Sequence, residues 1–161
     1  MTEGQRLGRH EYHQRLEELA SAFSGLHGRV EYGSRESETG ATVKLLITVH
    51  LPGWWLADQA TMVFVERHRR RGSFWERYAY LYDLHREPRP GGRFAYHWHD
   101  DVFHVHCVDP AGPQPDHHFA GSPVPDIFWA ADQLHQILDR GVDCVGLVPL
   151  RDWVEDTDPQ R

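Results

Sequence analysis

The stretch FAYHWHDDVFHVHCV, residues 94–108, decides the fold. Histidines alternate with apolar or aromatic residues on both sides of Asp100-Asp101. Two alternating runs separated by two residues predict a β-hairpin. Pairing about this turn would set His97 opposite His104, and a slip of one residue would mix the two faces. The stretch therefore predicts an imidazole face directed outward and an aromatic face directed inward. The inward residues would be Phe94, Tyr96, Trp98, Phe103, Val105 and Cys107.

The flanking segments predict more strands between two amphipathic helices. The spacing of apolar residues indicates helices over 11–26 and 126–139. Strands that follow one another directly favour an antiparallel sheet over βαβ units. We expect one α+β domain over residues 1–161: a single antiparallel sheet of five to seven strands, with an N-terminal and a C-terminal helix packed on one face. We expect flexible ends at 1–9 and 151–161. Further strands are expected at 29–32, 43–51, 61–68, 74–84 and 142–150.

Composition indicates a globular protein without a membrane span. Hydrophobic residues make up 40% and aromatic residues 12% of the 161 residues, which argues against global disorder. No apolar run reaches the length of a transmembrane helix, and the polar start predicts no secretion signal. Cys107 and Cys144 form no metal-type pair. One disulfide is conceivable, but a reduced cytoplasmic protein with Cys107 as a core thiol is the default expectation.

Charge is distributed unevenly along the chain. The net charge of −7 counts against tight nucleic-acid binding. A basic run nevertheless covers Arg67, Arg69, Arg70 and Arg71, and more arginines follow it. The simpler interpretation is a solvated strand end or loop, and the alternative is a basic patch on an acidic protein.

Histidines gather in and after the predicted hairpin, and three interpretations stay open. Neutral imidazoles on one strand face could bind a divalent metal such as zinc. They could instead act as acid and base without any metal, or be surface residues without chemistry. The metal ligands would be His97, His99, His104 and His106, with His117 and His118 nearby in the following loop.

Four motifs together resemble the TumE-type toxin family of bacterial toxin–antitoxin modules. The resemblance covers roughly residues 43–138. Where that family tends to have Arg-Tyr-Asp, this chain has Cys107-Val108-Asp109, so only the aspartate matches and a phosphate-binding role there is in doubt. The motifs are the run Arg77-Tyr78-Ala79-Tyr80, the segment from Phe94 to Asp100, the segment from Phe103 to Asp109, and Pro115-Asp116-His117-His118 before a closing helix.

The resemblance implies a cytoplasmic toxin-like protein with a DNA-binding antitoxin as partner and RNA as substrate. One imidazole would remove the ribose 2′-hydroxyl proton, another would protonate the leaving oxygen, and an arginine would stabilise the phosphorane. The alternatives are a non-catalytic domain that binds a divalent metal or a partner, and a metal-dependent hydrolase. The catalytic candidates are His97, His104, His117, His118 and Arg77, and the substrate-binding candidates are Tyr78, Tyr80, Arg93 and Asp109.

Overall fold

A computed structural model describes residues 14, 17–22, 29–51, 59–87, 92–108, 116–140, 144 and 154–155. Residues 17–22 are helical, which agrees with the predicted N-terminal helix. The predicted strand at 142–150 and the predicted flexible start lie outside the described residues, apart from Cys144. The elements are β1 (Arg29–Glu36), β2 (Thr42–Leu51), β3 (Gln59–Arg71), β4 (Phe74–Glu87), β5 (Arg93–His99), β6 (Val102–Val108), β7 (Asp116–Ala120), α2 (Ile127–Arg140) and β8 (Val154–Glu155).

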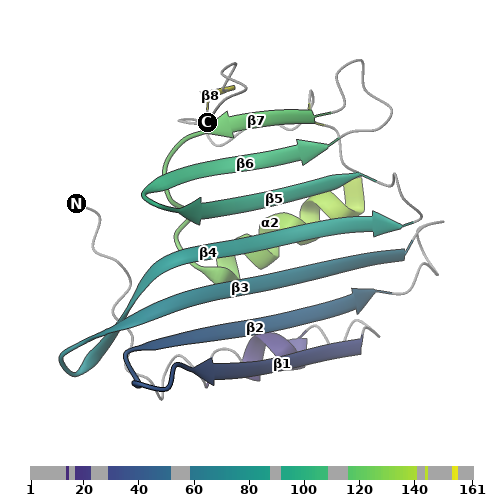
Figure 1. Cartoon of the computed structure of the whole chain (residues 1–161). Coiled ribbons are helices and arrows are strands. Elements are labelled where there is room, and N and C mark those ends of the chain that lie inside the picture. The colour runs from purple at the N-terminus through teal and green to yellow at the C-terminus, as the bar shows by residue number, and fades with distance from the viewer. Residues whose placement is uncertain are drawn as a thin grey trace.

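The strands form one antiparallel sheet in which spatial order equals chain order, from β1 to β8 (Figure 1). Seven strands have five or more residues, and β8 adds a two-residue pairing with β7. Helix α2 lies behind the middle of the sheet and contacts β3 and β4, and the N-terminal helical segment lies behind β1 and β2 on the same side (Figure 1). The predicted α+β class, sheet and helices are therefore confirmed.

Alternation in the strands places the core between the sheet and the helices. Along β2 every second residue, from Val43 to Leu51, is buried, as the period of two requires. Phe64 of β3 and Tyr82 of β4 pack into the same layer, where α2 contributes Leu134. The opposite face of the sheet, here called the open face, carries no helix among the described residues. The helix begins after Asp126, whose Oδ1 accepts a hydrogen bond of 2.8 Å from the Trp129 backbone N–H.

Strands β3 and β4 are longer than predicted, and a bulge changes which residues face the core. The basic run belongs to β3 and is not a loop. The register passes from Arg67 opposite Ala79 to His68 opposite Arg77, so Tyr78 is an extra residue in β4. Strict alternation along the strand predicted at 74–84 would place Tyr78, Tyr80 and Tyr82 on one face, but the bulge moves Tyr78 to the other face. Arg77 takes the core-facing position instead.

Arg77 is a buried structural residue. Its guanidinium donates hydrogen bonds to Glu66 Oε1 at 3.3 Å and to the Tyr82 hydroxyl at 2.8 Å. It also donates to two backbone carbonyls, that of Val124 at 2.8 Å and that of Pro125 at 2.9 Å. Tyr82 also donates a hydrogen bond to Glu66. These bonds join the β3–β4 pair to the segment that leads into α2. The prediction of Arg77 as a catalytic cation is corrected: this side chain points away from the open face.

Cys107 and Cys144 form a disulfide with a Cα–Cα distance of 5.7 Å. Cys107 lies on the core face of β6, and Cys144, which follows α2, is 3% exposed. The chain therefore brings the second cysteine back beneath the sheet. The expectation of a free core thiol at Cys107 is wrong, because the sequence did not show where the chain runs after the helix.

We predict that Arg77→Ala lowers the free energy of unfolding by about 3 kcal/mol or more, because it leaves the buried Glu66 carboxyl without its cation. Urea denaturation followed by circular dichroism measures the loss. The matched control is Arg69→Ala in the same hairpin, where the side chain is 45% exposed and its pair with Glu76 should contribute at most about 1 kcal/mol. Equal losses in the two variants would contradict the structural role of Arg77.

Candidate functional site on the open face

The β5–β6 hairpin has the register that the sequence predicts. His97 pairs with His104, and Trp98 pairs with Phe103. Asp100 and Asp101 have φ values of 50° and 61°, the left-handed conformation that a tight two-residue turn of this kind requires. The aromatic face is directed toward the core as predicted, with four of its six residues buried and Trp98 and Phe103 partly buried. The four buried residues are Phe94, Tyr96, Val105 and Cys107.

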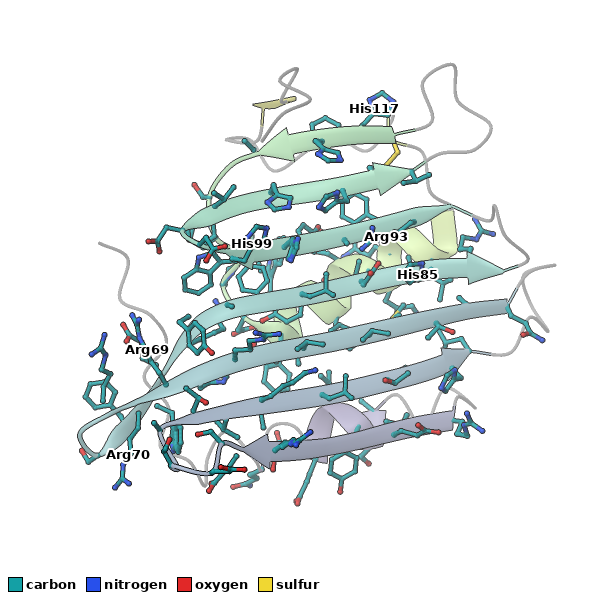
Figure 2. The ribbon with its side chains drawn as sticks, in the orientation of Figure 1. Arg69, Arg70, His85, Arg93, His99 and His117 are labelled. Atoms are coloured by element: carbon teal, nitrogen blue, oxygen red, sulfur yellow. A yellow bond between two sulfur atoms is a disulfide. The ribbon has the colours of Figure 1, made fainter. Side chains whose placement is uncertain are left out.

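Five imidazoles gather on the other face of this hairpin and of β7. The Nδ1 of His97 lies 3.1 Å from Nε2 of His104, which in turn lies 2.8 Å from Nε2 of His106. Strand β7 extends the chain of contacts, since His106 Nδ1 lies 3.1 Å from His118 Nε2. His99 stands near the turn end of β5, as Figure 2 shows, and its ring centre is 4.6 Å from that of His97. We call these residues (97, 99, 104, 106 and 118) the histidine cluster.

Burial favours the neutral form of two members of the cluster, His97 and His106. Burial lowers the pKa of His97, with smaller contributions from His99 and the Arg93 charge. Burial, followed by the neighbouring His104 and His118, lowers the pKa of His106 to about 3. Neutral imidazoles carry one proton and one lone pair each, so these two rings offer lone pairs at neutral pH.

The Nε2 atom of His104 has two short contacts but only one position for a proton or a lone pair. If both contacts were hydrogen bonds, Nε2 of His104 would have to donate one proton to both His97 and His106, or accept two protons with one lone pair. A cation resolves the conflict, because it accepts lone pairs from several nitrogens at once. One nitrogen from each of His97, His99 and His104 lies within 4.8 Å of the other two.

The remaining candidate residues divide between the two faces. His118 faces the cluster, but His117 pairs with Cys107 and its ring stacks on Phe119 on the core side. The expected grouping of His117 with the other candidate histidines is therefore wrong. The prediction of Tyr80 as a substrate-binding residue is also corrected. Its side chain is 2% exposed in the core, where its hydroxyl accepts a hydrogen bond from the Val124 N–H. Tyr78 lies on the open face beside Arg67 and Lys44 and not among the histidines. Asp109 lies outside the described residues.

Arg93 lies at the site as predicted, but the sequence did not indicate its neighbours there, Asp83 and His85. Its guanidinium donates to both oxygens of Asp83, at 2.8 to 3.2 Å, and His85 Nε2 lies 3.0 Å from the same carboxylate. Asp83 is 4% exposed and sits across from Ala95, beside the cluster. A lone aspartate between Tyr82 and Leu84 in an alternating strand is the only sequence signal for this group. Figure 2 shows Arg93 and His85 together at the end of the sheet opposite His99.

Comparison of the chain with models of protein families, with curated proteins and with solved structures finds no match. The resemblance to TumE-type toxins therefore stays a prediction from the residues alone. Within the part of the chain that the structure describes, no helix has the length and apolar character to cross a bilayer.

We predict that His106 stays neutral in the folded protein from pH 8 down to about pH 4. The unfolded chain takes up a proton near the ordinary imidazole value of 6.5, and the folded chain does so only near pH 3. The contribution of His106 to stability should thus be complete above about pH 6.5 and decline as the pH falls toward 3. NMR titration of the His106 ring in metal-free protein tests this, with the urea-unfolded protein as control. A folded-state midpoint near 6.5 would contradict it.

Proposed function

We propose that this protein binds one divalent transition-metal ion of the zinc class on its open face, with His97, His99 and His104 as ligands. The observation that carries the proposal is the convergence of one nitrogen from each ring within 4.8 Å. The two flanking histidines of the cluster, His106 and His118, would line the site beside the three ligands.

The separation of two of the ligand nitrogens suits such an ion. Zinc–nitrogen bonds of about 2.0–2.1 Å in a tetrahedron place the ligand nitrogens about 3.3 Å apart. The separation of 3.1 Å between His97 Nδ1 and His104 Nε2 is close to that edge. Imidazole ligands without a carboxylate among them favour zinc, copper or nickel over magnesium and calcium. Three ligands leave a fourth position for water or substrate, and a metal there would acidify that water.

His99 is the exposed member of the trio, and an aspartate orients it. Its Nδ1 lies 3.2 Å from Asp100 Oδ2, so a proton on Nδ1 would bond to the carboxylate. That tautomer leaves the Nε2 lone pair available to a metal. The turn residue thus supports both the hairpin and the ligand geometry.

The same distances weaken a metal-free acid–base role. A general base and a general acid must lie on either side of the reacting phosphodiester, but His97 and His104 are in direct contact. A lowered pKa also leaves His97 without the proton that an acid donates at neutral pH.

A toxin-type ribonuclease is the second candidate, and Arg93 is the observation in its favour. Its charge is close enough to lower the pKa values of His97 and His106, so it could also stabilise a phosphorane on the open face. The cognate antitoxin, the RNA substrate and the cytoplasmic location belong to this candidate alone. The disulfide at Cys107 counts against it, because the cytosol keeps most protein thiols reduced.

We predict that untagged protein binds one equivalent of zinc, and that His104→Ala weakens binding by more than about 100-fold. Loss of a direct ligand should exceed the 10- to 100-fold cost typical of removing a residue that only supports one. Isothermal titration with zinc, together with metal analysis of the purified protein, gives both numbers.

The matched control is His117→Ala, which removes an imidazole from the opposite face of the neighbouring strand. It should bind zinc with unchanged affinity. The proposal fails if the unaltered protein takes up no zinc, or if the two variants lose affinity equally.

We predict that EDTA removes any hydrolytic activity of the protein, since a bound metal would supply the reactive water. The ribonuclease candidate predicts the reverse: RNA cleavage that survives EDTA, and growth arrest on expression that His97→Ala relieves. Cleavage of a labelled RNA with and without EDTA, run beside the expression assay, distinguishes the two. EDTA-resistant cleavage would favour the second candidate over the metal-dependent one.

A further inference from the structure

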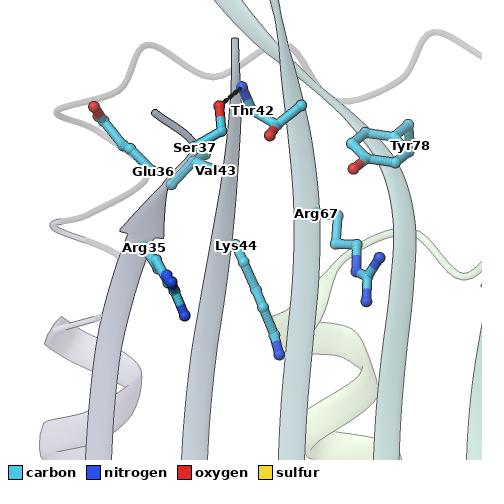
Figure 3. A pocket seen from close by; sticks show the side chains of 8 residues that line it. All are labelled: Arg35, Glu36, Ser37, Thr42, Val43, Lys44, Arg67 and Tyr78. Carbon is cyan, nitrogen blue, oxygen red and sulfur yellow. Dashed lines mark hydrogen bonds between the residues drawn. The ribbon is translucent and has the colours of Figure 1, made fainter. Parts of the chain in front are cut away.

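A row of three basic side chains crosses the open face on β1, β2 and β3, away from the strands that carry the histidine cluster. The register aligns Arg35 of β1 with Lys44 of β2 and Lys44 with Arg67 of β3, so all three leave the sheet on the same side. Figure 3 shows their charged ends extending in the same direction from three adjacent strands. Like charges directly opposite one another destabilise a sheet, so the row has an energetic cost in the empty protein.

None of these three side chains forms an ion pair or hydrogen bond with the described part of the chain. Other arginines of the sheet do have acidic partners: Arg69 and Arg71 bind Glu76, and Arg93 binds Asp83. Among the described residues the row is therefore a cluster of three positive charges without an acidic partner, on a protein whose net charge is −7. A bound anion would relieve the repulsion.

The row borders a shallow pocket of about 230 Å³. Its far wall is the ring of Tyr78, the extra residue of the β4 bulge, and the Arg69 guanidinium lies 5.7 Å from the centre of that ring. Bulges commonly re-aim a side chain at a functional site. Ser37 and Thr42 add hydroxyl groups to the lining, and the Glu36 carboxylate points away from the three cations in Figure 3.

We propose that Arg35, Lys44 and Arg67 bind the phosphate or diphosphate group of a small phosphorylated ligand, with Tyr78 forming the pocket wall. A guanidinium group can donate two parallel hydrogen bonds to two phosphate oxygens, and the lysine adds a compact third positive charge. The small volume suits one phosphoryl or pyrophosphoryl group better than an extended polymer backbone. The site is separate from the histidine cluster, because β3 and β5 are two strand spacings, or about 10 Å, apart.

Isothermal titration of the full, EDTA-treated chain with inorganic phosphate and with pyrophosphate tests the proposal, and removing metal keeps the result independent of zinc binding. We expect saturable binding, tighter for pyrophosphate and weaker at high salt. Lys44→Gln and Arg67→Gln should each weaken pyrophosphate binding by about tenfold, since each removes a charge-assisted bond. Circular dichroism verifies that the variants are folded.

The matched control is Arg29→Gln, a basic residue of the same strand as Arg35 that already pairs with Glu31 at 3.2 Å. Its pyrophosphate affinity should be unchanged. Absence of saturable binding, or equal losses in all three variants, would overturn the proposal. Binding of an RNA oligonucleotide through Lys44 and Arg67 without any binding of pyrophosphate would overturn it as well.

Discussion

Asp100 and Asp101 both adopt a left-handed backbone, and their turn fixes which residues of β5 and β6 face each other. With this register the aromatic residues enter the core and the imidazoles meet on the open face. Shifting the pairing by one residue would bury histidines and expose Tyr96 or Val105 to water. The geometry of the histidine cluster thus depends on the same hydrophobic burial that holds the sheet against α2.

The bulge at Tyr78 connects the two faces of the sheet. One extra residue in β4 sends Arg77 into the core, where its hydrogen bonds reach the carbonyls before α2, and it leaves Tyr78 on the open face. A buried guanidinium is tolerated only when its donors are satisfied, and Glu66, Tyr82 and the two carbonyls meet that need. The same irregularity therefore stabilises the packing of the helix and shapes a pocket on the opposite surface.

The sequence predicted the features that follow from local period and turn chemistry. Strict alternation fixed the hairpin, its two faces and the opposition of His97 to His104, and the succession of strands predicted the antiparallel sheet. It failed where one residue breaks the period: beyond the bulge, alternation assigned Tyr78 and Arg77 to the wrong faces. It also failed for contacts between distant segments, because no periodic signal places Cys144 beside Cys107 or sends His117 to the core side.

Spatial order equals chain order in this sheet, so every strand pairs with its neighbours in the chain. Each hairpin from β1 to β7 closes a short loop, and the entropy lost in closing it is small; among the described strands only β8 pairs across a long connection, which includes α2. The longer-range connections include Arg77 with Val124, 47 residues apart, and the disulfide, whose cysteines are 37 positions apart in the sequence. The sheet from β1 to β7 is therefore built from local hairpins, whereas the packing of α2 and the disulfide join segments that are distant in the chain.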